Sequence, residues 1–232
     1  MPQRPGSRQL PLDLGHQSGF SRDDLVVTTA NEQAVAHIEH WPDWPSPVTI
    51  LAGPPGSGKS HLAAIWRERA DASVIDPADI GISEDASPVA LVEDCDRAAL
   101  DQTGLFHLIN AVRAGGGSLL LTARSFPAGW GVTLPDLASR LKAAATVEIQ
   151  EPDDALLAGV IAKLFADRQV EVEPHVVQFV ARRIERSLST ANAVVERLDR
   201  AALQQKSRIT RALAATVVDA MDGGQGQLEL GQ

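Results

Sequence analysis

The sequence contains a single cysteine, Cys95, among its 232 residues. One cysteine cannot form a disulfide within the chain, and it excludes a zinc site made of several cysteines. Long apolar runs are also missing. Stretches such as Leu119–Leu121 are far too short to cross a bilayer, and the N-terminus has no apolar segment typical of a signal peptide. These absences predict a cytoplasmic protein without a membrane partner.

Positive charge is scarce as well. The chain has 21 Lys and Arg residues against 30 Asp and Glu residues, which gives a net charge of −9. A protein that binds duplex DNA by neutralising phosphates needs a basic face, so this balance argues against such binding, although it leaves room for a local basic patch. The 44% apolar and 22% charged residues are close to globular averages, so we expect most of the chain to fold.

The two ends differ from the rest in composition. Residues 1–19 are rich in Pro, Gly, Gln, Ser and Arg, and residues 222–232 have a similar character. Such segments bury too little apolar surface to fold alone, so we expect a flexible leader and a disordered tail.

Residues 20–151 carry the pattern of an α/β domain. Short apolar runs that suit strands lie in VTILAG, PVALVEDCD, GGSLLLTAR and ATVEIQEP. Such runs are typical of strands covered on both faces, and the helix-like segments between them predict a parallel sheet. An amphipathic helix is expected before the first strand, with apolar residues at Ala34, Val35, Ile38 and Trp41, and WPDWPSP ends it.

Residues 152–221 are expected to form helices alone. The four segments are DDALLAGVIAKLFADRQ, EPHVVQFVARRIERS, STANAVVERLDRAALQQ and TRALAATVVDAM. Asp153, Ser189 and Thr210 stand where helix N-caps are expected. The sequence therefore predicts a small all-helical domain behind the α/β domain.

The segment GPPGSGKS matches the phosphate-binding loop pattern G-x-x-x-x-G-K-[ST] in full, between a predicted strand and a predicted helix. In such a loop, backbone N–H groups face the nucleotide phosphates at a helix N-terminus, where the helix dipole favours anions. Lys59 would supply a positive charge, and the Ser60 hydroxyl would bind Mg²⁺. The predicted nucleotide-binding residues of this segment are Gly53, Pro54, Pro55, Gly56, Ser57, Gly58, Lys59, Ser60 and His61.

Acidic residues follow a neighbouring apolar run, where a P-loop requires a partner for the metal ion. Glu93 and Asp94 come directly after the run 89–92. We expect both to coordinate Mg²⁺ together with Ser60, directly or through water, and to polarise the attacking water. The alternative is an ordinary solvated strand end.

A third polar position follows the strand in LLLTARSFP. Thr122 or Arg124 stands where a P-loop ATPase places a side chain that senses the γ-phosphate. For either residue, an ordinary strand-to-loop transition is the alternative.

Four segments together resemble the AAA+ core of the DnaA family of replication initiators, and within it the DnaA-homologous Hda/HdaA regulators. They are GPPGSGKSHL, ALVEDCD, LLLTARSFP and LPDLASRLKAAATVEIQEPDD, and the resemblance covers about residues 20–220. It implies a three-layer AAA+ α/β domain with a helical lid. It also implies that Arg140, in the SRL segment, is an arginine finger that reaches a neighbouring protomer's nucleotide, and that Leu25, Val26 and Val27 contact adenine.

The sequence departs from the family at several positions. Glu93 replaces the aspartate usual at the first acidic position, and Arg124 stands where an aspartate is usual. The arginine expected in the lid falls on Ser189 or Thr190, and without that cation a γ-phosphate is held less firmly. We therefore expect weak or no ATPase activity from this chain alone, with ADP or ATP and Mg²⁺ as its ligands.

The leader contains QLPLDL, which resembles the peptide that binds the β sliding clamp. An extended segment presents alternate side chains to one side, so Leu10, Leu12 and Leu14 could enter an apolar groove while Gln9 forms a hydrogen bond at its edge. In the tail, Gln227, Leu228 and Leu230 echo this pattern faintly, and we read them as disordered tail with a weaker clamp contact as the alternative.

These features predict a negative regulator of replication initiation, bound to the clamp, that stimulates ATP hydrolysis by DnaA through Arg140. We expect contact with DNA only through the clamp, because no DNA-reading domain follows Met221. A homodimer or higher oligomer remains open. Two other functions also remain open: a self-sufficient AAA+ ATPase, such as a helicase loader or clamp-loader subunit, and a P-loop nucleotide kinase.

Overall fold

The computed structural model describes residues 25–81, 89–97 and 99–225. The predicted clamp peptide (Gln9, Leu10, Leu12 and Leu14) and the tail residues Gln227, Leu228 and Leu230 therefore lie outside the described residues.

The first part of the chain is built on a five-stranded sheet with the order β2-β3-β4-β1-β5, in which all paired strands are parallel. The strands are β1 (Val48–Ala52), β2 (Ser73–Ile75), β3 (Val89–Val92), β4 (Ser118–Ala123) and β5 (Ala145–Glu148). The four runs expected to be strands are confirmed. Strand β2 was not expected, because it has only three residues and two of them are exposed.

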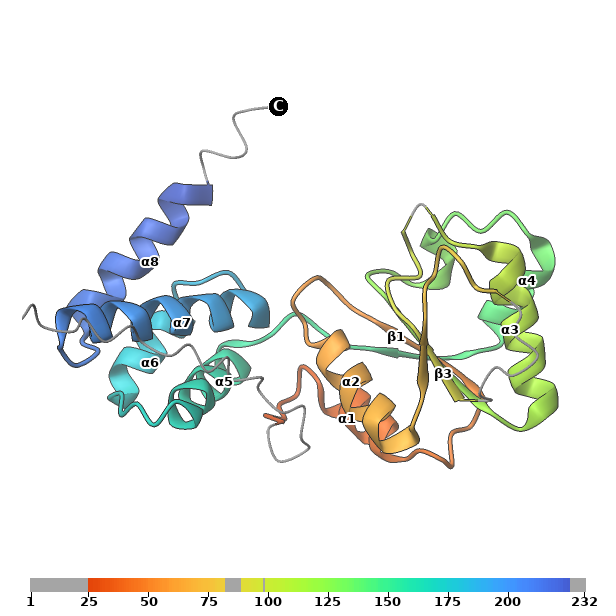
Figure 1. The fold of residues 1–232 in the computed structure, drawn as a ribbon, viewed down its shortest axis with the longest axis horizontal. Coiled ribbons are helices and arrows are strands. Elements are labelled where there is room, and N and C mark those ends of the chain that lie inside the picture. Colours follow the sequence, from red (N-terminus) through yellow and green to blue (C-terminus); the bar gives the residue numbers. More distant parts are fainter. Residues whose placement is uncertain (1–24, 82–88, 98, 226–232) are drawn as a thin grey trace, which may run out of the picture.

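Helices cover both faces of the sheet, which gives three layers (Figure 1). On one face lie α1 (Glu32–Glu39) and α2 (Lys59–Ala70), and on the other lie α3 (Gln102–Gly115) and α4 (Pro135–Lys142). Each pair of helices has its own apolar cluster against the sheet, so the central strands β1, β3 and β4 are buried from both sides, as their continuous apolar runs predict.

Helix α1 ends earlier than its apolar pattern indicates. It stops at Glu39, so Trp41 lies beyond it and not on its face. The loop after α1 forms an aromatic stack, in which the ring of Trp44 lies 5.4 Å from that of His37 and 5.2 Å from that of the buried Trp66. The loop thus belongs to the core of this face.

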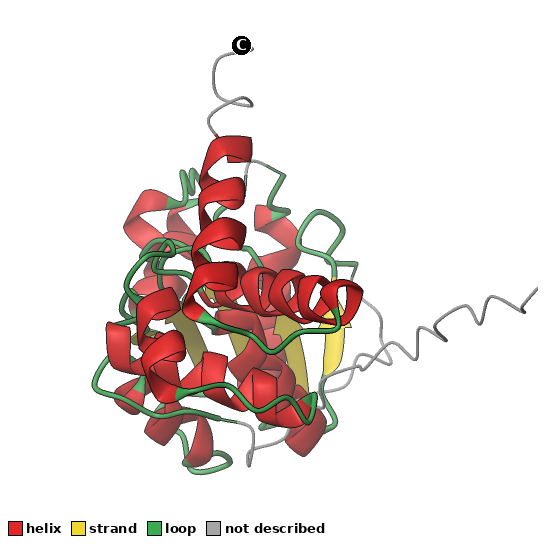
Figure 2. Cartoon of the chain, turned by 90° about the vertical axis from the view of Figure 1, so that its left-hand side faces the viewer, coloured by secondary structure: helices red, strands yellow, loops and turns green. Residues whose placement is uncertain are grey.

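The second part of the chain is the helical lid, which lies beside the α/β layers in Figure 1. Its helices are α5 (Asp154–Asp167), α6 (Pro174–Ala181), α7 (Leu188–Gln205) and α8 (Arg211–Gln225). They enclose an apolar cluster of their own around Phe165, Val180 and Leu198. Figure 2, viewed from the lid side, shows these helices in front of the strands.

The ends of the lid helices test the expected caps. The Asp153 side chain accepts a hydrogen bond from Leu156 N at 2.6 Å, and Thr210 Oγ1 accepts one from Leu213 N at 3.3 Å, so both caps are confirmed. The cap expected at Ser189 is wrong. Ser187, which has an extended backbone, accepts from Thr190 N and is the N-cap of α7.

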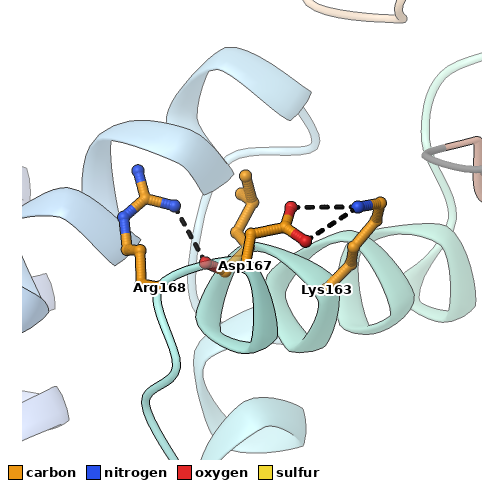
Figure 3. A network of polar contacts seen from close by, with 4 residues as sticks. Lys163, Asp167 and Arg168 are labelled. Atoms are coloured by element: carbon orange, nitrogen blue, oxygen red, sulfur yellow. Dashed lines mark hydrogen bonds and ion pairs between the residues drawn. The ribbon is translucent and has the colours of Figure 1, made fainter. Parts of the chain in front are cut away.

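The C-terminal turn of α5 is fixed by side chains of opposite charge (Figure 3). Lys163 Nζ contacts both carboxylate oxygens of Asp167, at 3.0 and 2.9 Å, and Arg168 Nη1 donates to the Leu164 carbonyl at 2.9 Å. A cation that caps free carbonyls is favourable at a helix C-terminus.

Helix α8 runs to Gln225 and so includes residues 222–225, which were expected to belong to the tail. Extending a formed helix adds one backbone hydrogen bond per residue, and this explains why the helix crosses the compositional boundary. None of the helices in the described ranges is long and apolar enough to cross a membrane.

Candidate functional site

The P-loop lies where the sequence predicts it, between β1 and the first turn of α2. Gly56 and Gly58 have φ values of +71° and +103°, the left-handed conformations that glycine adopts without a Cβ penalty. Lys59 Nζ donates to the carbonyl oxygens of Gly53 at 2.7 Å and Pro54 at 2.8 Å. The lysine therefore lies folded over its own loop, and a phosphate would have to compete with these two carbonyls.

The charges around Lys59 act on its pKa in opposite directions. Burial lowers the pKa of the amine, the carboxylates of Asp94 and Asp96 raise it, and the Arg124 guanidinium lowers it. Two acids and a second cation are thus near enough to the P-loop lysine for their charges to reach it.

The acidic residues after β3 lie in different environments. Glu93 Oε1 is buried and has no hydrogen-bond partner among the described residues, so this oxygen is available to coordinate a metal ion. Asp94 has a left-handed backbone, with φ of +56°, and its carboxylate pairs with Arg97 at 3.0 Å. Ser60 is exposed in the first turn of α2.

These oxygen donors fit Mg²⁺, which takes one or two carboxylates and completes its shell with phosphate and water. Within the ranges that the structure describes, no three His, Cys, Asp or Glu side chains gather as a ready-made metal cluster. A magnesium ion here would therefore depend on Ser60, Glu93 and the nucleotide itself.

The end of β4 holds the two residues predicted to sense the γ-phosphate. Thr122 is buried, and its hydroxyl accepts a hydrogen bond from Asp94 N at 3.1 Å. Arg124 is exposed, and its side chain forms no ion pair or hydrogen bond with any described residue. The structure thus engages Thr122 within the fold and leaves the Arg124 guanidinium available.

The lid touches the P-loop directly. Leu188 N donates to Gly56 O at 2.7 Å, and a Cβ added at Gly56 would collide with Ser187 Oγ. The lid positions where a family arginine was expected instead pair their hydroxyls, Ser189 with Ser187 Oγ at 2.7 Å and Thr190 with Glu185 at 3.3 Å. Hydroxyl groups at the start of α7 therefore stand beside the P-loop in place of a cation.

The predicted adenine segment lies between the α/β layers and the lid. Leu25 packs against the cluster beneath α1 and α2, and Val26 O accepts a hydrogen bond from the buried Asn31 Nδ2 at 2.9 Å. A Cβ added at Gly159 of α5 would lie 2.7 Å from Val26 Cγ1. Val27 is exposed. The segment therefore contacts both parts of the chain.

Arg140 lies apart from the P-loop residues. It is in the last turn of α4, which packs on α3 across the sheet from α2. Its side chain is partly exposed and forms no ion pair or hydrogen bond with the described part of the chain.

Two residues that contact the site's loops could not be found by motif. Asp96 accepts backbone hydrogen bonds from Arg124 and Ser125, and Ser187 fills the space against Gly56. Both contacts join segments far apart in the sequence, so no local spacing signals them.

Comparisons with known proteins agree with this geometry. A family model described as "Hda, lid domain" matches residues 160–217. An uncharacterized protein of Haemophilus influenzae is 28% identical over 110 residues, which cover 47% of this chain and 48% of that protein. The match therefore spans about half the length of that relative.

Solved structures share the fold at low sequence identity. Domain III of the Thermotoga maritima replication initiation protein DnaA has a TM-score of 0.75 and 17% identity, covering 87% of this chain and 96% of that one. AMPPCP-bound DnaA from Aquifex aeolicus has a TM-score of 0.66 and 17% identity, covering 76% and 64%. The Thermotoga maritima Holliday junction branch migration motor RuvB has a TM-score of 0.61 and 17% identity, covering 82% and 66%.

The parallel sheet, the P-loop and the match to the lid model thus indicate the same fold. Residues 160–217 match the Hda lid-domain model, and the chain as a whole shares the fold of the DnaA and RuvB structures.

Proposed function

We propose that this chain binds an adenine nucleotide between the P-loop, the segment Leu25–Val27 and the start of α7. The backbone N–H groups of residues 56–60 and the Lys59 amine would hold the phosphates, with His61 next to them in the first turn of α2. Ser60 and Glu93, with Asp94 nearby, would hold Mg²⁺. When bound, the ion neutralises phosphate charge and orients the phosphates.

Hydrolysis by this chain alone is expected to be weak. Asp94, the second acidic residue, faces Arg97 at 3.0 Å, and the lid offers hydroxyls where an arginine would hold a γ-phosphate. Both features reduce the charge stabilisation on which phosphoryl transfer depends. We therefore propose that the nucleotide, ADP or ATP, mainly keeps the chain in a binding-competent shape.

We further propose that the chain regulates replication initiation by acting on DnaA-ATP. Arg140 supports this proposal. The resemblance implies that it is an arginine finger, its guanidinium has no ion-pair partner in the described chain, and it lies across the sheet from the chain's own α2. From the face of the sheet opposite α2, Arg140 would serve a nucleotide on another subunit and not the one at its own P-loop. There it would stabilise charge on the γ-phosphate during transfer.

The leader would determine where this action occurs. Gln9, Leu10, Leu12 and Leu14 would bind the β sliding clamp, so contact with DNA would be indirect and the chain would act only where a clamp is loaded. Tethering raises the effective concentration of the chain near DNA-bound DnaA without any new contact.

The proposal is tested by mixing DnaA-ATP, clamp-loaded DNA and this chain, and measuring the release of phosphate. We expect hydrolysis to rise only when all three are present, and replacing Gln9 and Leu10 by alanine should abolish this clamp-dependent stimulation without unfolding the core. Undiminished stimulation by the leader variant would refute the clamp tether. Multiple turnover by the isolated chain would favour a self-sufficient ATPase instead.

A further inference from the structure

The loops after β3 and β4 are held together by a set of hydrogen bonds centred on Asp96. Its Oδ2 atom accepts from Arg124 N at 2.9 Å, from Ser125 N at 3.1 Å and from Ser125 Oγ at 3.2 Å. Thr122 adds two bonds, from its hydroxyl to Asp94 N at 3.1 Å and from its carbonyl to Cys95 N at 2.9 Å. The acidic loop and the loop that carries Arg124 therefore form one unit.

Arg124 leaves the sheet beside the P-loop. Ala123, the residue before it, pairs with Ala52 at the end of β1, and the Ala123 carbonyl accepts from Gly53 N at 3.2 Å. The guanidinium is exposed and also contributes to lowering the pKa of Lys59, so its charge acts within the site. No described residue pairs with it.

The far side of the Arg124 loop is fixed as well. Trp130 is buried, and its Nε1–H donates to the Ser125 carbonyl at 2.8 Å. Gly129 N donates to Phe126 O at 2.8 Å and closes the next turn. Asp96 accepts hydrogen bonds from the N–H groups of Arg124 and Ser125, and Trp130 donates one to the Ser125 carbonyl, so the backbone around Arg124 is held from two sides.

We propose that Asp96 is a positioning residue that fixes Arg124 as the cation by which this chain distinguishes ATP from ADP. The inference rests on the proposed nucleotide binding at the P-loop. The start of α7 presents hydroxyl groups where a lid arginine is expected. Arg124 is a cation beside the P-loop that pairs with no described residue, so it remains available for a third phosphate. A charge-assisted hydrogen bond of this kind corresponds to about tenfold or more in affinity.

Asp96 would act on Arg124 and not on the nucleotide. A carboxylate near phosphates repels them, so its direct charge effect would disfavour both nucleotides. Its favourable effect comes through the two backbone N–H groups that it holds, and an asparagine amide oxygen could also accept these. Replacing Asp96 by asparagine removes the charge but keeps the acceptor, whereas replacing it by alanine removes both. Comparing the two variants therefore separates the effect of the charge from that of the hydrogen bonds.

The test compares the affinities of the full chain for Mg²⁺-AMPPCP and Mg²⁺-ADP by calorimetry. The measured quantity is the ratio of the two dissociation constants. We expect Arg124→Ala and Asp96→Ala each to shift this ratio against AMPPCP by about tenfold, and the double variant to shift it no further, because both substitutions act on one interaction. Asp96→Asn should keep the wild-type ratio.

A matched control is Asp101→Ala. Asp101, in the β3–α3 connection, also accepts from a backbone N–H group, that of Gly104 in the first turn of α3 at 2.9 Å, but it does so as the N-cap of α3. It should lower stability without changing the ratio. The indole N–H resonance of Trp130 reports whether the loop around Ser125 keeps its structure in each variant.

An unchanged ratio in Asp96→Ala, or proportionate losses for both ligands, would overturn the inference. If Asp96→Ala does not fold, two other results overturn the inference. One is an unchanged ratio of dissociation constants in Arg124→Ala, and the other is an Asp96→Asn variant whose ratio is shifted as far as that of Arg124→Ala. A wild-type chain that binds neither nucleotide would instead refute the proposed nucleotide binding. Loss of ligand discrimination with intact stimulation of DnaA would support the inference and leave the regulatory proposal standing.

Discussion

Replacing Gly56 by alanine tests whether the lid rests on the P-loop. Gly56 has a φ of +71°, and an added Cβ would collide with Ser187 Oγ and lie 2.8 Å from Ser187 Cβ. The left-handed conformation costs a non-glycine residue about 1–2 kcal/mol, and an overpacked contact costs about 1–3 kcal/mol. The two costs add, so we expect the free energy of unfolding to fall by about 2–5 kcal/mol.

Gly116 provides the matched control for the backbone cost. Its φ is +69°, close to that of Gly56, but an added Cβ meets no atom within 4 Å. Gly116→Ala should therefore show the conformational cost alone, about 1–2 kcal/mol. The difference between the two variants isolates the contact with Ser187.

The assay is urea unfolding followed by tryptophan fluorescence and far-ultraviolet circular dichroism. A second substitution, Ser187→Gly, removes the atoms that the new methyl group meets and by itself costs only a few tenths of a kcal/mol as a helix cap. In the Gly56→Ala background it should restore most of the contact cost. Equal destabilisation by Gly56→Ala and Gly116→Ala would refute the contact between the lid and the P-loop.

Three further predictions concern other parts of the fold. Burial and His40 lower the pKa of His37, so the unfolded chain binds its proton more readily and stability should decrease as the pH falls below about 6.5. His37→Phe should reduce this loss in urea titrations at pH 7 and pH 5, and an unchanged loss would contradict the assignment. Burial raises the pKa of the Cys95 thiol, so a disulfide reagent at pH 8 should label it only in urea; rapid labelling of the native chain would disagree. Gly159→Ala should lower the free energy of unfolding because the new methyl group would lie 2.7 Å from Val26 Cγ1. Val26→Ala in that background should recover the lost stability, and a stabilised Gly159→Ala variant would contradict the close contact.

The local motifs of the site could be predicted from the sequence because their chemistry depends on consecutive residues. The P-loop needs a strand, a glycine-rich turn and a helix in direct succession, and residues 48–70 supply all three. The apolar runs likewise predicted strands β1, β3, β4 and β5. The pattern was continuous enough to indicate a sheet covered on both faces.

Contacts between distant segments could not be predicted in this way. Asp96 and Ser125 are separated by 29 positions, and nothing around Asp96 distinguishes it from other acids after a strand. The N-cap of α7 was misplaced because Ser187 and Ser189 are both suitable residues. The choice between them is made by the extended backbone at Ser187 and its contact with Gly56, which are tertiary features.

The most direct test of the central claim is a single-turnover measurement of γ-phosphate release from DnaA loaded with radiolabelled ATP. The reaction contains clamp-loaded DNA and either the wild-type chain or Arg140→Ala, with Lys142→Ala on the same helix as the control. We expect the wild type and the Lys142 variant to accelerate release alike, and Arg140→Ala to lose about a thousandfold of the acceleration or all that can be measured. Equal acceleration by wild type and Arg140→Ala would contradict the account.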